Sequence, residues 1–393
     1  MPDTARSPSG DETDTTAVLA GHRYARTMTL DGLRLTAFTD AHEVGGAEIS
    51  LANLLAALDP TIEARVMGTD RSVIERVAAG RPGTATILTP PIRGLRDVGA
   101  MIATRRSIAA DRPDILHVSL ASPWACRYAI LAAATVPGVR AVAVEQLVLP
   151  LPTARVRLLK RLTARRLAAH VAVGTASARA VERDAGLPAG SVRTIHNGVP
   201  DRPVPAPDPG APHPAVVTLA RLDAVKGLDV LVRAVAAIPD LHATVVGRGP
   251  ERDALTREAA ALGVADRFHL VGWRDDPMAA LADADLFVLA SRAEGLPLSI
   301  AEAMLAGRAV VATDVGSVRE IVEDGVTGLL VRPDDAEALT AAIRALLDDP
   351  TRRAALAGAA RARAAAEFTA DAMARRYEAL YAEVLAGIGT ARP

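Results

Sequence analysis

Two glutamates, Glu294 and Glu302, lie eight residues apart around a short turn that joins an apolar strand, Leu286–Leu289, to a following helix. Gly295 and Pro297 lie in this turn, so the first backbone N–H groups of the helix are free to bind an anion. Both carboxylates can face one ligand and accept hydrogen bonds from its hydroxyl groups. The spacing therefore suits a ligand that carries phosphate and hydroxyl groups. A helix-start acid beside an unrelated surface glutamate would show the same spacing.

Two basic residues follow another apolar strand, Val217–Ala220. Arg221 comes directly after the strand, and Lys226 stands just before the next helix. Cations at the carboxyl end of a strand and beside a helix N-terminus can clamp a diphosphate. Of the 45 basic residues only Lys160 and Lys226 are lysines, and lysine is the compact charge that suits phosphate oxygens. A solvated pair on a loop is the alternative, but together with the first turn the pattern favours a sugar-nucleotide site.

Two glycine-containing turns could add to such a site. Segment 246–251 is a strand followed by a turn with Gly247 and Gly249, and it matches half of the dinucleotide-binding fingerprint. Because such turns are frequent in α/β proteins, this match carries little weight alone. Gly45 and Gly46 follow the first strand and would let a ligand approach the backbone closely. Ordinary turn chemistry explains these two glycines equally well.

Other catalytic chemistries have weaker support. Asp283 and Asp285 could form a metal-binding pair, but acids between a helix and a buried strand usually serve as caps. His117 ends an apolar strand and can be structural or catalytic. The single cysteine, Cys126, excludes an internal disulfide framework and a cysteine-based zinc site. No Ser–His–Asp or paired-histidine pattern stands out, and we predict neither a metal nor a cofactor.

The order of the elements predicts how these groups are positioned. From Leu33 the chain alternates short apolar runs with longer helical stretches, which indicates parallel sheets covered by helices on both faces. Seven prolines between Pro200 and Pro214 interrupt the alternation and predict an extended hinge. We therefore expect an α/β protein with two Rossmann-like domains that face each other across a cleft.

The predicted organisation has four parts. Residues 1–27 are rich in Asp, Thr, Ser and Gly and are expected to form a disordered tail. Residues 28–198 form the first domain, residues 199–369 the second domain, and residues 370–393 a C-terminal segment. That segment contains an amphipathic stretch, Ala370–Leu385, which predicts a helix that packs back on the first domain.

Taken together, these motifs resemble those of the retaining family-4 glycosyltransferases, which have the GT-B fold. The resemblance runs over roughly residues 33–388 and is strongest in the second half. Five motifs occur in the family's order: Gly45-Gly46, Asn197-Gly198-Val199, Arg221 with Lys226, Gly247-x-Gly249-Pro250, and Glu294 with Glu302. The last pair is similar to the family's E-x7-E motif, and the two cations are similar to its diphosphate pair.

The resemblance implies a transferase that moves a sugar from a UDP- or GDP-linked donor to a hydroxyl acceptor, with retention of configuration and without a metal. Arg221 and Lys226 would neutralise the leaving diphosphate, and Glu294 would hold the transferred sugar during catalysis. Glu302 would bind the ribose hydroxyls. The other donor-binding positions that it implies are Gly45, Gly46, Gly295, Leu296, Pro297, Leu298 and Ser299. Catalysis would then rest on charge stabilisation and domain closure.

The chain departs from the family's pattern at two places. Gln146 stands where the family usually has a histidine near the donor sugar, and glutamine can hydrogen-bond but cannot carry a proton charge. Ser317 and Val318 stand before Glu320 where the family often has glycine and a small apolar residue. The first departure keeps open a degenerate protein that binds a sugar nucleotide without turnover. An epimerase or phosphorylase of similar fold is a further alternative.

The charge pattern predicts which partners the protein has. A net charge of −1 argues against nucleic-acid binding, and the acidic N-terminus and the lack of an 18-residue apolar run indicate a cytoplasmic protein. A helical stretch after Gln146 is rich in leucine and contains six basic residues. These are Arg155, Arg157, Lys160, Arg161, Arg165 and Arg166. They could form a solvated face, or they could dock peripherally on the inner face of an anionic membrane. The hydroxyl acceptor could be lipid-linked, a saccharide or a small molecule.

Overall fold

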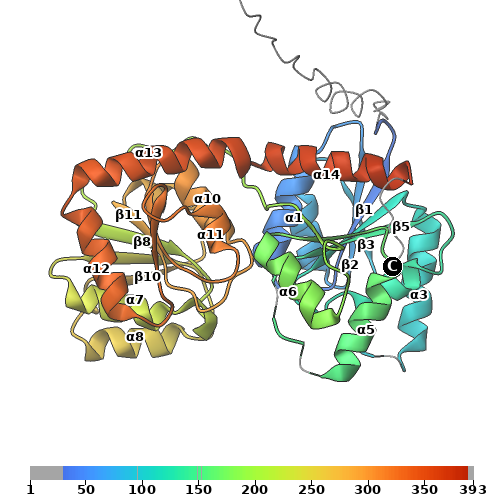
Figure 1. Cartoon of the computed structure of the whole chain (residues 1–393), viewed down its shortest axis with the longest axis horizontal. Coiled ribbons are helices and arrows are strands. Elements are labelled where there is room, and N and C mark those ends of the chain that lie inside the picture. The colour runs from blue at the N-terminus through green and yellow to red at the C-terminus, as the bar shows by residue number, and fades with distance from the viewer. Residues whose placement is uncertain (1–29, 95, 148, 152, 388–393) are drawn as a thin grey trace, which may run out of the picture.

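The computed structural model of this protein describes residues 30–387, except 95, 148 and 152. The tail predicted for residues 1–27 lies outside the described residues. Two α/β units lie side by side, and two consecutive helices, α13 (Pro350–Glu367) and α14 (Ala370–Leu385), run along one edge of both (Figure 1). In the described residues each unit contains one sheet of parallel strands, as the alternation of elements predicts.

The first sheet has the strand order β3-β2-β1-β4-β5-β6-β7. Its strands are β1 (Arg34–Thr39), β2 (Glu63–Gly68), β3 (Ala85–Leu88), β4 (Ile115–Leu120), β5 (Arg140–Glu145), β6 (Ala169–Ala172) and β7 (Arg193–Thr194). The helices of this unit are α1 (Gly46–Ala57), α2 (Arg71–Ala78), α3 (Val98–Asp111), α4 (Arg127–Ala133), α5 (Ala154–Ala164) and α6 (Thr175–Ala185). All six residues of β4 are buried, as expected for a central strand covered on both faces.

The second sheet has the strand order β10-β9-β8-β11-β12-β13. Its strands are β8 (Ala215–Leu219), β9 (His242–Val246), β10 (Phe268–Gly272), β11 (Leu286–Leu289), β12 (Ala309–Thr313) and β13 (Gly328–Val331). Its helices are η2 (Ala224–Lys226), α7 (Leu228–Ala237), α8 (Arg252–Ala261), α9 (Met278–Ala282), α10 (Leu298–Leu305), α11 (Val318–Ile321) and α12 (Ala336–Leu347). The strand order reverses between β8 and β11, which pair in parallel. Ligands of open α/β sheets bind at the carboxyl ends of the strands at such a reversal.

Several predicted elements are found at their predicted bounds, and one starts later. Strand Leu286–Leu289 and helix Ala370–Leu385 match the sequence prediction to the residue. The apolar pattern also predicts a helix over Ala121–Ala134, after the strand that contains His117. Helix α4 begins only at Arg127, because Cys126 has a left-handed backbone and its N–H donates to Asp40. The domain boundaries at residues 198 and 369 stay predictions.

The C-terminal helix α14 packs on the first unit as predicted, mainly against α1. Tyr381 Oη lies 2.7 Å from His117 Nδ1, and the Tyr377 ring meets the His117 ring edge-on at 5.2 Å. Burial lowers the pKa of His117 to about 4, so the ring is neutral at physiological pH. His117 therefore belongs to the contact that holds α14, which favours the structural alternative.

Candidate functional site

Lys226 and Glu294 meet at the strand-order reversal of the second sheet. Lys226 ends η2 after β8, and Glu294 lies in the loop between β11 and α10. Lys226 Nζ donates to Glu294 Oε1 at 2.7 Å, and Ser291 Oγ donates to the same oxygen at 2.6 Å. The Glu294 side chain is only 7% exposed, whereas the Lys226 side chain is 22% exposed. The structure thus brings together two residues that the sequence analysis placed in one site.

Arg221 lies on the same turn but points toward solvent. Its side chain is 56% exposed, and its Nε donates to Asp223 Oδ2 at 2.9 Å. The backbone around it is held by the Gly247–Gly249 turn, because Leu222 N donates to Arg248 O at 2.9 Å. This glycine-containing turn therefore supports the segment that carries Arg221.

A close backbone packing holds η2 against the end of β11. Gly227 follows Lys226 with a φ of +60°, a conformation that favours glycine. A Cβ at this position would overlap the carbonyl oxygen of Ala290, the residue directly after β11. The close approach of these two segments is what lets Lys226 reach Glu294.

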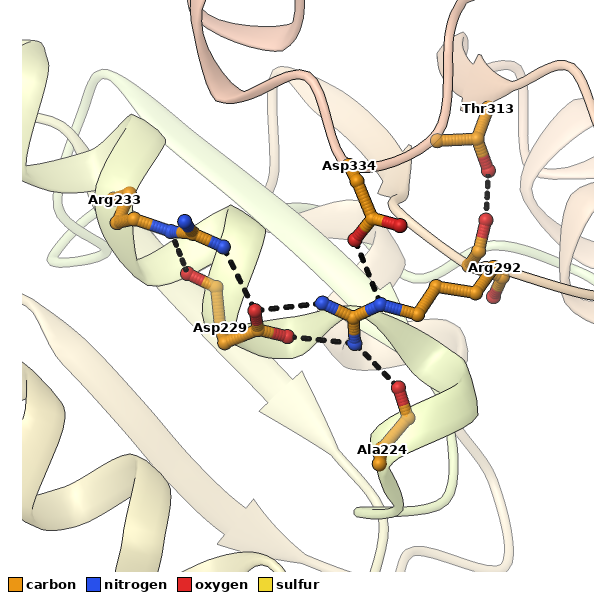
Figure 2. Close-up of polar contacts among 7 residues, drawn as sticks. Ala224, Asp229, Arg233, Arg292, Thr313 and Asp334 are labelled. Carbon is orange, nitrogen blue, oxygen red and sulfur yellow. Dashed lines mark hydrogen bonds and ion pairs between the residues drawn. The ribbon is translucent and has the colours of Figure 1, made fainter.

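Arg292 ties the same two segments together through its side chain, as Figure 2 shows. Its Nη1 and Nη2 donate to the two carboxylate oxygens of Asp229 at 2.9 and 2.7 Å, and its Nε donates to Asp334 at 2.7 Å. Nη1 also donates to the carbonyl of Ala224 in η2. The sequence analysis missed this cluster. The available signal was an arginine two residues before Glu294 and an acid three residues after Lys226.

Glu302 lies in the second turn of α10, below the loop that carries Glu294. Glu302 is partly buried. Burial raises the pKa of its carboxyl to about 7, although the attraction of Arg202 opposes this shift. The predicted donor-binding positions Gly295, Leu296 and Pro297 lie in the loop, and Leu298 and Ser299 begin the helix. The first amides of α10 have no partner within the helix, so they can bind an anion.

The first domain approaches this loop through Gln146. A Cβ at Gly295 would overlap the backbone carbonyl oxygen of Gln146, so the two domains are in close contact here. The Gln146 side chain accepts a hydrogen bond from Asn197 Nδ2 at 3.0 Å through its Oε1. Asn197 Oδ1 in turn accepts from Ser50 Oγ at 2.7 Å. Gln146 and Gly295, predicted to contact the same donor, therefore lie together at the domain boundary.

Gly45 and Gly46 lie at the start of α1, after the first strand. Glu48 holds this turn, because its carboxylate accepts from Gly45 N at 3.1 Å and from Thr39 Oγ1 at 3.1 Å. Burial raises the pKa of Glu48 above its usual range. The structure accounts for the shape of this turn with local hydrogen bonds and leaves the donor-binding role of both glycines a prediction.

A second contact between the domains is formed by Glu320. Its carboxylate accepts hydrogen bonds from Thr175 N at 2.7 Å and Ala176 N at 2.9 Å, the first amides of α6. His196 Nε2 lies 3.1 Å from the same carboxylate. Ser317 is one of the departures from the family's pattern. Its Oγ lies 3.2 Å from Ser177 Oγ. The segment 317–320 thus serves as an interdomain contact.

Asp283 and Asp285 were considered as metal ligands. Instead, each carboxylate accepts a hydrogen bond from a backbone amide, at a strand start or in a loop. Asp285 accepts from Ala215 N at 3.0 Å, at the start of β8, and pairs with Arg353 at 3.3 Å. Asp283 accepts from Asp208 N at 2.8 Å. Within the described part of the chain, no three His, Cys, Asp or Glu side chains gather in an arrangement that could hold a metal ion.

Lys160 does not belong to the exposed basic face, so this part of the membrane prediction was wrong. Its side chain is 9% exposed and pairs with Glu145, which is fully buried at the end of β5 and also contacts His170 Nε2 at 2.7 Å. Burial would raise the pKa of Glu145, but the attraction of Lys160 and the contact with His170 lower it. A buried ammonium needs such a partner because desolvation is costly.

The five arginines of the predicted basic face are exposed, as are two leucines on the same helix. The arginines are Arg155, Arg157, Arg161, Arg165 and Arg166. Leu158 is 56% exposed and Leu162 is 45% exposed. None of the helices in the described residues is both long and apolar enough to cross a lipid bilayer.

Comparisons with known proteins agree with this architecture. Solved structures with the same arrangement include Anabaena Alr3699/HepE in complex with UDP. That match has a TM-score of 0.77 and 22% identity, and it covers 89% of this chain and 100% of that chain. Sucrose-phosphate synthase from Thermosynechococcus elongatus matches with a TM-score of 0.72 and 21% identity, over 90% of this chain and 99% of that one. The chain has the GT-B fold.

Each half of the chain also matches a family of glycosyltransferases. Residues 44–202 match the family described as Glycosyltransferase Family 4, and residues 213–349 match the family described as Glycosyl transferases group 1. The lipopolysaccharide core biosynthesis glycosyltransferase LpsE of Rhizobium meliloti is 34% identical over 175 residues, which are 44% of this chain and 52% of that protein.

A mannosyltransferase of Mycolicibacterium smegmatis is a further relative. Its name is GDP-mannose-dependent alpha-(1-6)-phosphatidylinositol monomannoside mannosyltransferase. It is 38% identical over 182 residues, which are 40% of this chain and 47% of that protein. The chain therefore aligns with about half the length of the curated relatives that it matches.

Proposed function

We propose that this protein is a retaining glycosyltransferase that moves a sugar, a hexose in the simplest case, from a UDP- or GDP-linked donor to a hydroxyl acceptor without a metal. The observation that carries this proposal is the ion pair of Lys226 and Glu294 at the strand-order reversal of the second sheet. It places a cation for phosphate and a carboxylate for hydroxyl groups within one hydrogen bond of each other. The matches to glycosyltransferase families in both halves support the same function.

The two cations would stabilise the negative charge that develops on the leaving diphosphate. Arg221 is exposed and needs only to turn away from Asp223 to contact a phosphate. Lys226 is held by Glu294, so its ammonium is already positioned before the donor binds. Preorganised charges of this kind lower the barrier because they need no rearrangement during the reaction.

The carboxylates of Glu294 and Glu302 would each bind a different part of the donor. Glu294 is nearest to Lys226 and to the Gln146 side of the domain boundary, where the transferred sugar would lie. Glu302 lies deeper along α10, where its carboxyl can accept hydrogen bonds from the ribose hydroxyls. Retention would follow if the departing phosphate deprotonates the acceptor on the face that it leaves.

The acceptor side would involve the exposed face of α5. Five arginines and the exposed Leu158 and Leu162 combine positive charge with apolar side chains on one surface segment. Such a combination suits an anionic lipid surface, because each cation near it contributes about 1 kcal/mol. We propose that this face docks peripherally on an anionic membrane and presents a lipid-linked acceptor to the first domain.

A panel of nucleotide sugars tests the proposed function. UDP- and GDP-linked hexoses are screened by thermal shift, because a ligand that binds only the folded state raises the melting temperature. The donors that bind are then incubated with candidate acceptors, and release of the nucleotide is measured. Donor binding with sugar transfer is the expected result. If donors bind but no nucleotide is released, either with any of the acceptors or by hydrolysis of the donor, the protein is a non-catalytic binder instead.

A further inference from the structure

Arg292 connects the two segments that carry Lys226 and Glu294 without a hydrogen bond to either of these side chains. It lies two residues before Glu294, and its own backbone N–H donates to Val225 O at 2.7 Å, in the turn that ends at Lys226. Its side chain donates to the preceding carbonyl, that of Ala224. One residue therefore binds two consecutive carbonyls of η2, one through the main chain and one through the guanidinium.

The far side of the guanidinium is anchored to two acids. Asp229, in the first turn of α7, accepts two parallel hydrogen bonds, and Asp334, after β13, accepts a third (Figure 2). This bidentate geometry is available to arginine but not to lysine, because only the planar guanidinium presents parallel donors. The side chain is thereby fixed in orientation as well as in position.

The remaining part of the loop is fixed by its neighbours. Ser291 O accepts a hydrogen bond from Thr313 Oγ1 at 2.6 Å, which ties the loop to β12. Ser291 Oγ donates to the Glu294 carboxylate. With Arg292 between them, Ser291 and Glu294 are held to the second sheet on one side and to η2 on the other. Both attachments are made within three residues of Glu294, whose carboxylate accepts from Lys226 Nζ at 2.7 Å.

We propose that Arg292 is a positioning residue that holds the cation and the carboxylate of the donor site in their reactive arrangement, through Asp229 and Asp334. This inference rests on the proposed transfer reaction for its effect on rate. Its structural content, the position of the Lys226 ammonium, is independent of that reaction. Misplacement of a catalytic group by about 1 Å can lower a rate by about 100-fold.

The chain offers a matched control for the loss of a partly buried arginine. Arg267 is partly buried in the same domain, and its Nη1 donates to the carbonyls of Ile238 and Leu241 at 3.1 and 2.9 Å. It binds backbone carbonyls at the C-terminal end of α7 and beyond it, including that of Val235 in the last turn, whereas Asp229 lies in the first turn. Arg267→Gln therefore removes a comparable number of hydrogen bonds from the domain without touching the loops of the site.

The first measurement needs no activity. The chain contains two lysines, so the amines that can be acetylated are Lys160, Lys226 and the N-terminus. Wild type, Arg292→Gln and Arg267→Gln are labelled with isotopic acetic anhydride, and the labelling rate of each lysine is measured by mass spectrometry. We expect Lys226 to be labelled several-fold faster in Arg292→Gln and unchanged in Arg267→Gln. Lys160, which pairs with Glu145 in the other domain, serves as an internal reference. An unchanged rate at Lys226 overturns the inference.

The second measurement links this position to transfer. Arg292→Gln should lower kcat/KM for the donor by up to about 100-fold, with a loss in melting temperature no greater than that of Arg267→Gln. In the Lys226→Ala background the same substitution should have a smaller further effect, because one of the two groups that it positions is gone. The proposal is contradicted if the losses of kcat/KM from Arg292→Gln and Lys226→Ala multiply fully in the double variant. It is also contradicted if Arg267→Gln lowers kcat/KM as much as Arg292→Gln does. If Arg292→Gln does not fold, Asp334→Asn removes one anchor and is measured in the same way.

The two proposals can fail separately. A wild type that binds no nucleotide sugar removes the proposed function, while the labelling rates still decide whether Arg292 positions Lys226. A wild type that transfers sugar, together with unchanged labelling of Lys226 in Arg292→Gln, keeps the function and removes the positioning role.

Discussion

The Glu320 carboxylate of the second domain accepts a hydrogen bond from Thr175 N, the first helical amide of α6 in the first domain, at 2.7 Å. Desolvation would raise the pKa of Glu320, but the hydrogen bonds from His196, Thr175 and Ala176 outweigh it and lower the pKa to about 2. The group is therefore ionised at any physiological pH. An anion at a helix N-terminus is also favoured by the helix dipole. This contact holds the two domains together on the side of Ser317.

Glu320→Ala should loosen the arrangement of the domains. Hydrogen bonds to a charged group contribute about 1.5–3 kcal/mol, and their loss here leaves the α6 amides without their partner. We expect a larger radius of gyration in small-angle X-ray scattering and a lower rate of transfer. Glu323→Ala is the control, since Glu323 pairs with Arg363 of the same domain. Identical scattering for wild type and Glu320→Ala would show that the contact does not set the domain arrangement.

Lys226→Ala should slow sugar transfer. The loss of transition-state stabilisation should be about 2–4 kcal/mol, the range for the loss of one preorganised charge contact. The ammonium is positioned by Glu294 before the donor binds, so its removal affects the leaving diphosphate directly. Steady-state kinetics with the preferred donor measure this loss. Wild-type activity should be unchanged in EDTA. Activity that stops in EDTA and returns with manganese would show that a metal supplies the charge instead.

Glu302→Ala and Glu294→Ala should have different effects on donor use. Loss of Glu302 should weaken binding of the free nucleoside diphosphate, because that residue is predicted to contact the ribose. Loss of Glu294 should leave this binding largely intact and impair transfer. Calorimetry with UDP or GDP, which lack the sugar, measures the first effect. Equal losses of affinity in both variants would refute this division of roles.

The pKa of Glu302, about 7 in the free protein, predicts a pH dependence of nucleotide binding. Ribose hydroxyls donate hydrogen bonds to the ionised carboxylate, so binding should lower this pKa and release a proton near pH 7. Affinity should therefore rise as the pH increases through the pKa of the free protein. Calorimetry in two buffers of different ionisation enthalpy counts the protons released. The glutamine in Glu302→Gln cannot titrate, so this variant should release fewer protons on binding. Equal proton release by wild type and Glu302→Gln would exclude this linkage.

The exposed face of α5 should bind anionic vesicles at low salt and release them at high salt, because surface charge is screened within about 10 Å at 0.1 M salt. Flotation measures the bound fraction. Leu158→Gln combined with Leu162→Gln should reduce it, whereas Leu262→Gln, an exposed leucine of the second domain, should not. A protein that fails to float even at low salt would point to a soluble acceptor.

The sequence by itself determined the local elements and the order of the motifs. Strand Leu286–Leu289 and helix Ala370–Leu385 follow from apolar periodicity, which acts over a few residues and needs no knowledge of the rest of the chain. Because parallel strands in this order end at one edge of the sheet, Arg221 and Glu294 could also be assigned to one site. The GT-B fold was expected from the same pattern together with the family resemblance.

Only the tertiary structure decided which charged groups meet. Lys160 has the sequence context of an exposed basic helix, yet it is buried against Glu145. Arg292 and Asp229 are 63 residues apart, and Glu320 and Thr175 are 145 residues apart. No local pattern specifies such pairs, because a buried or half-buried charge is stable only where packing supplies its partner and excludes water. The motifs could therefore be read from the sequence, whereas the contacts that position their charged groups come from the packed domains.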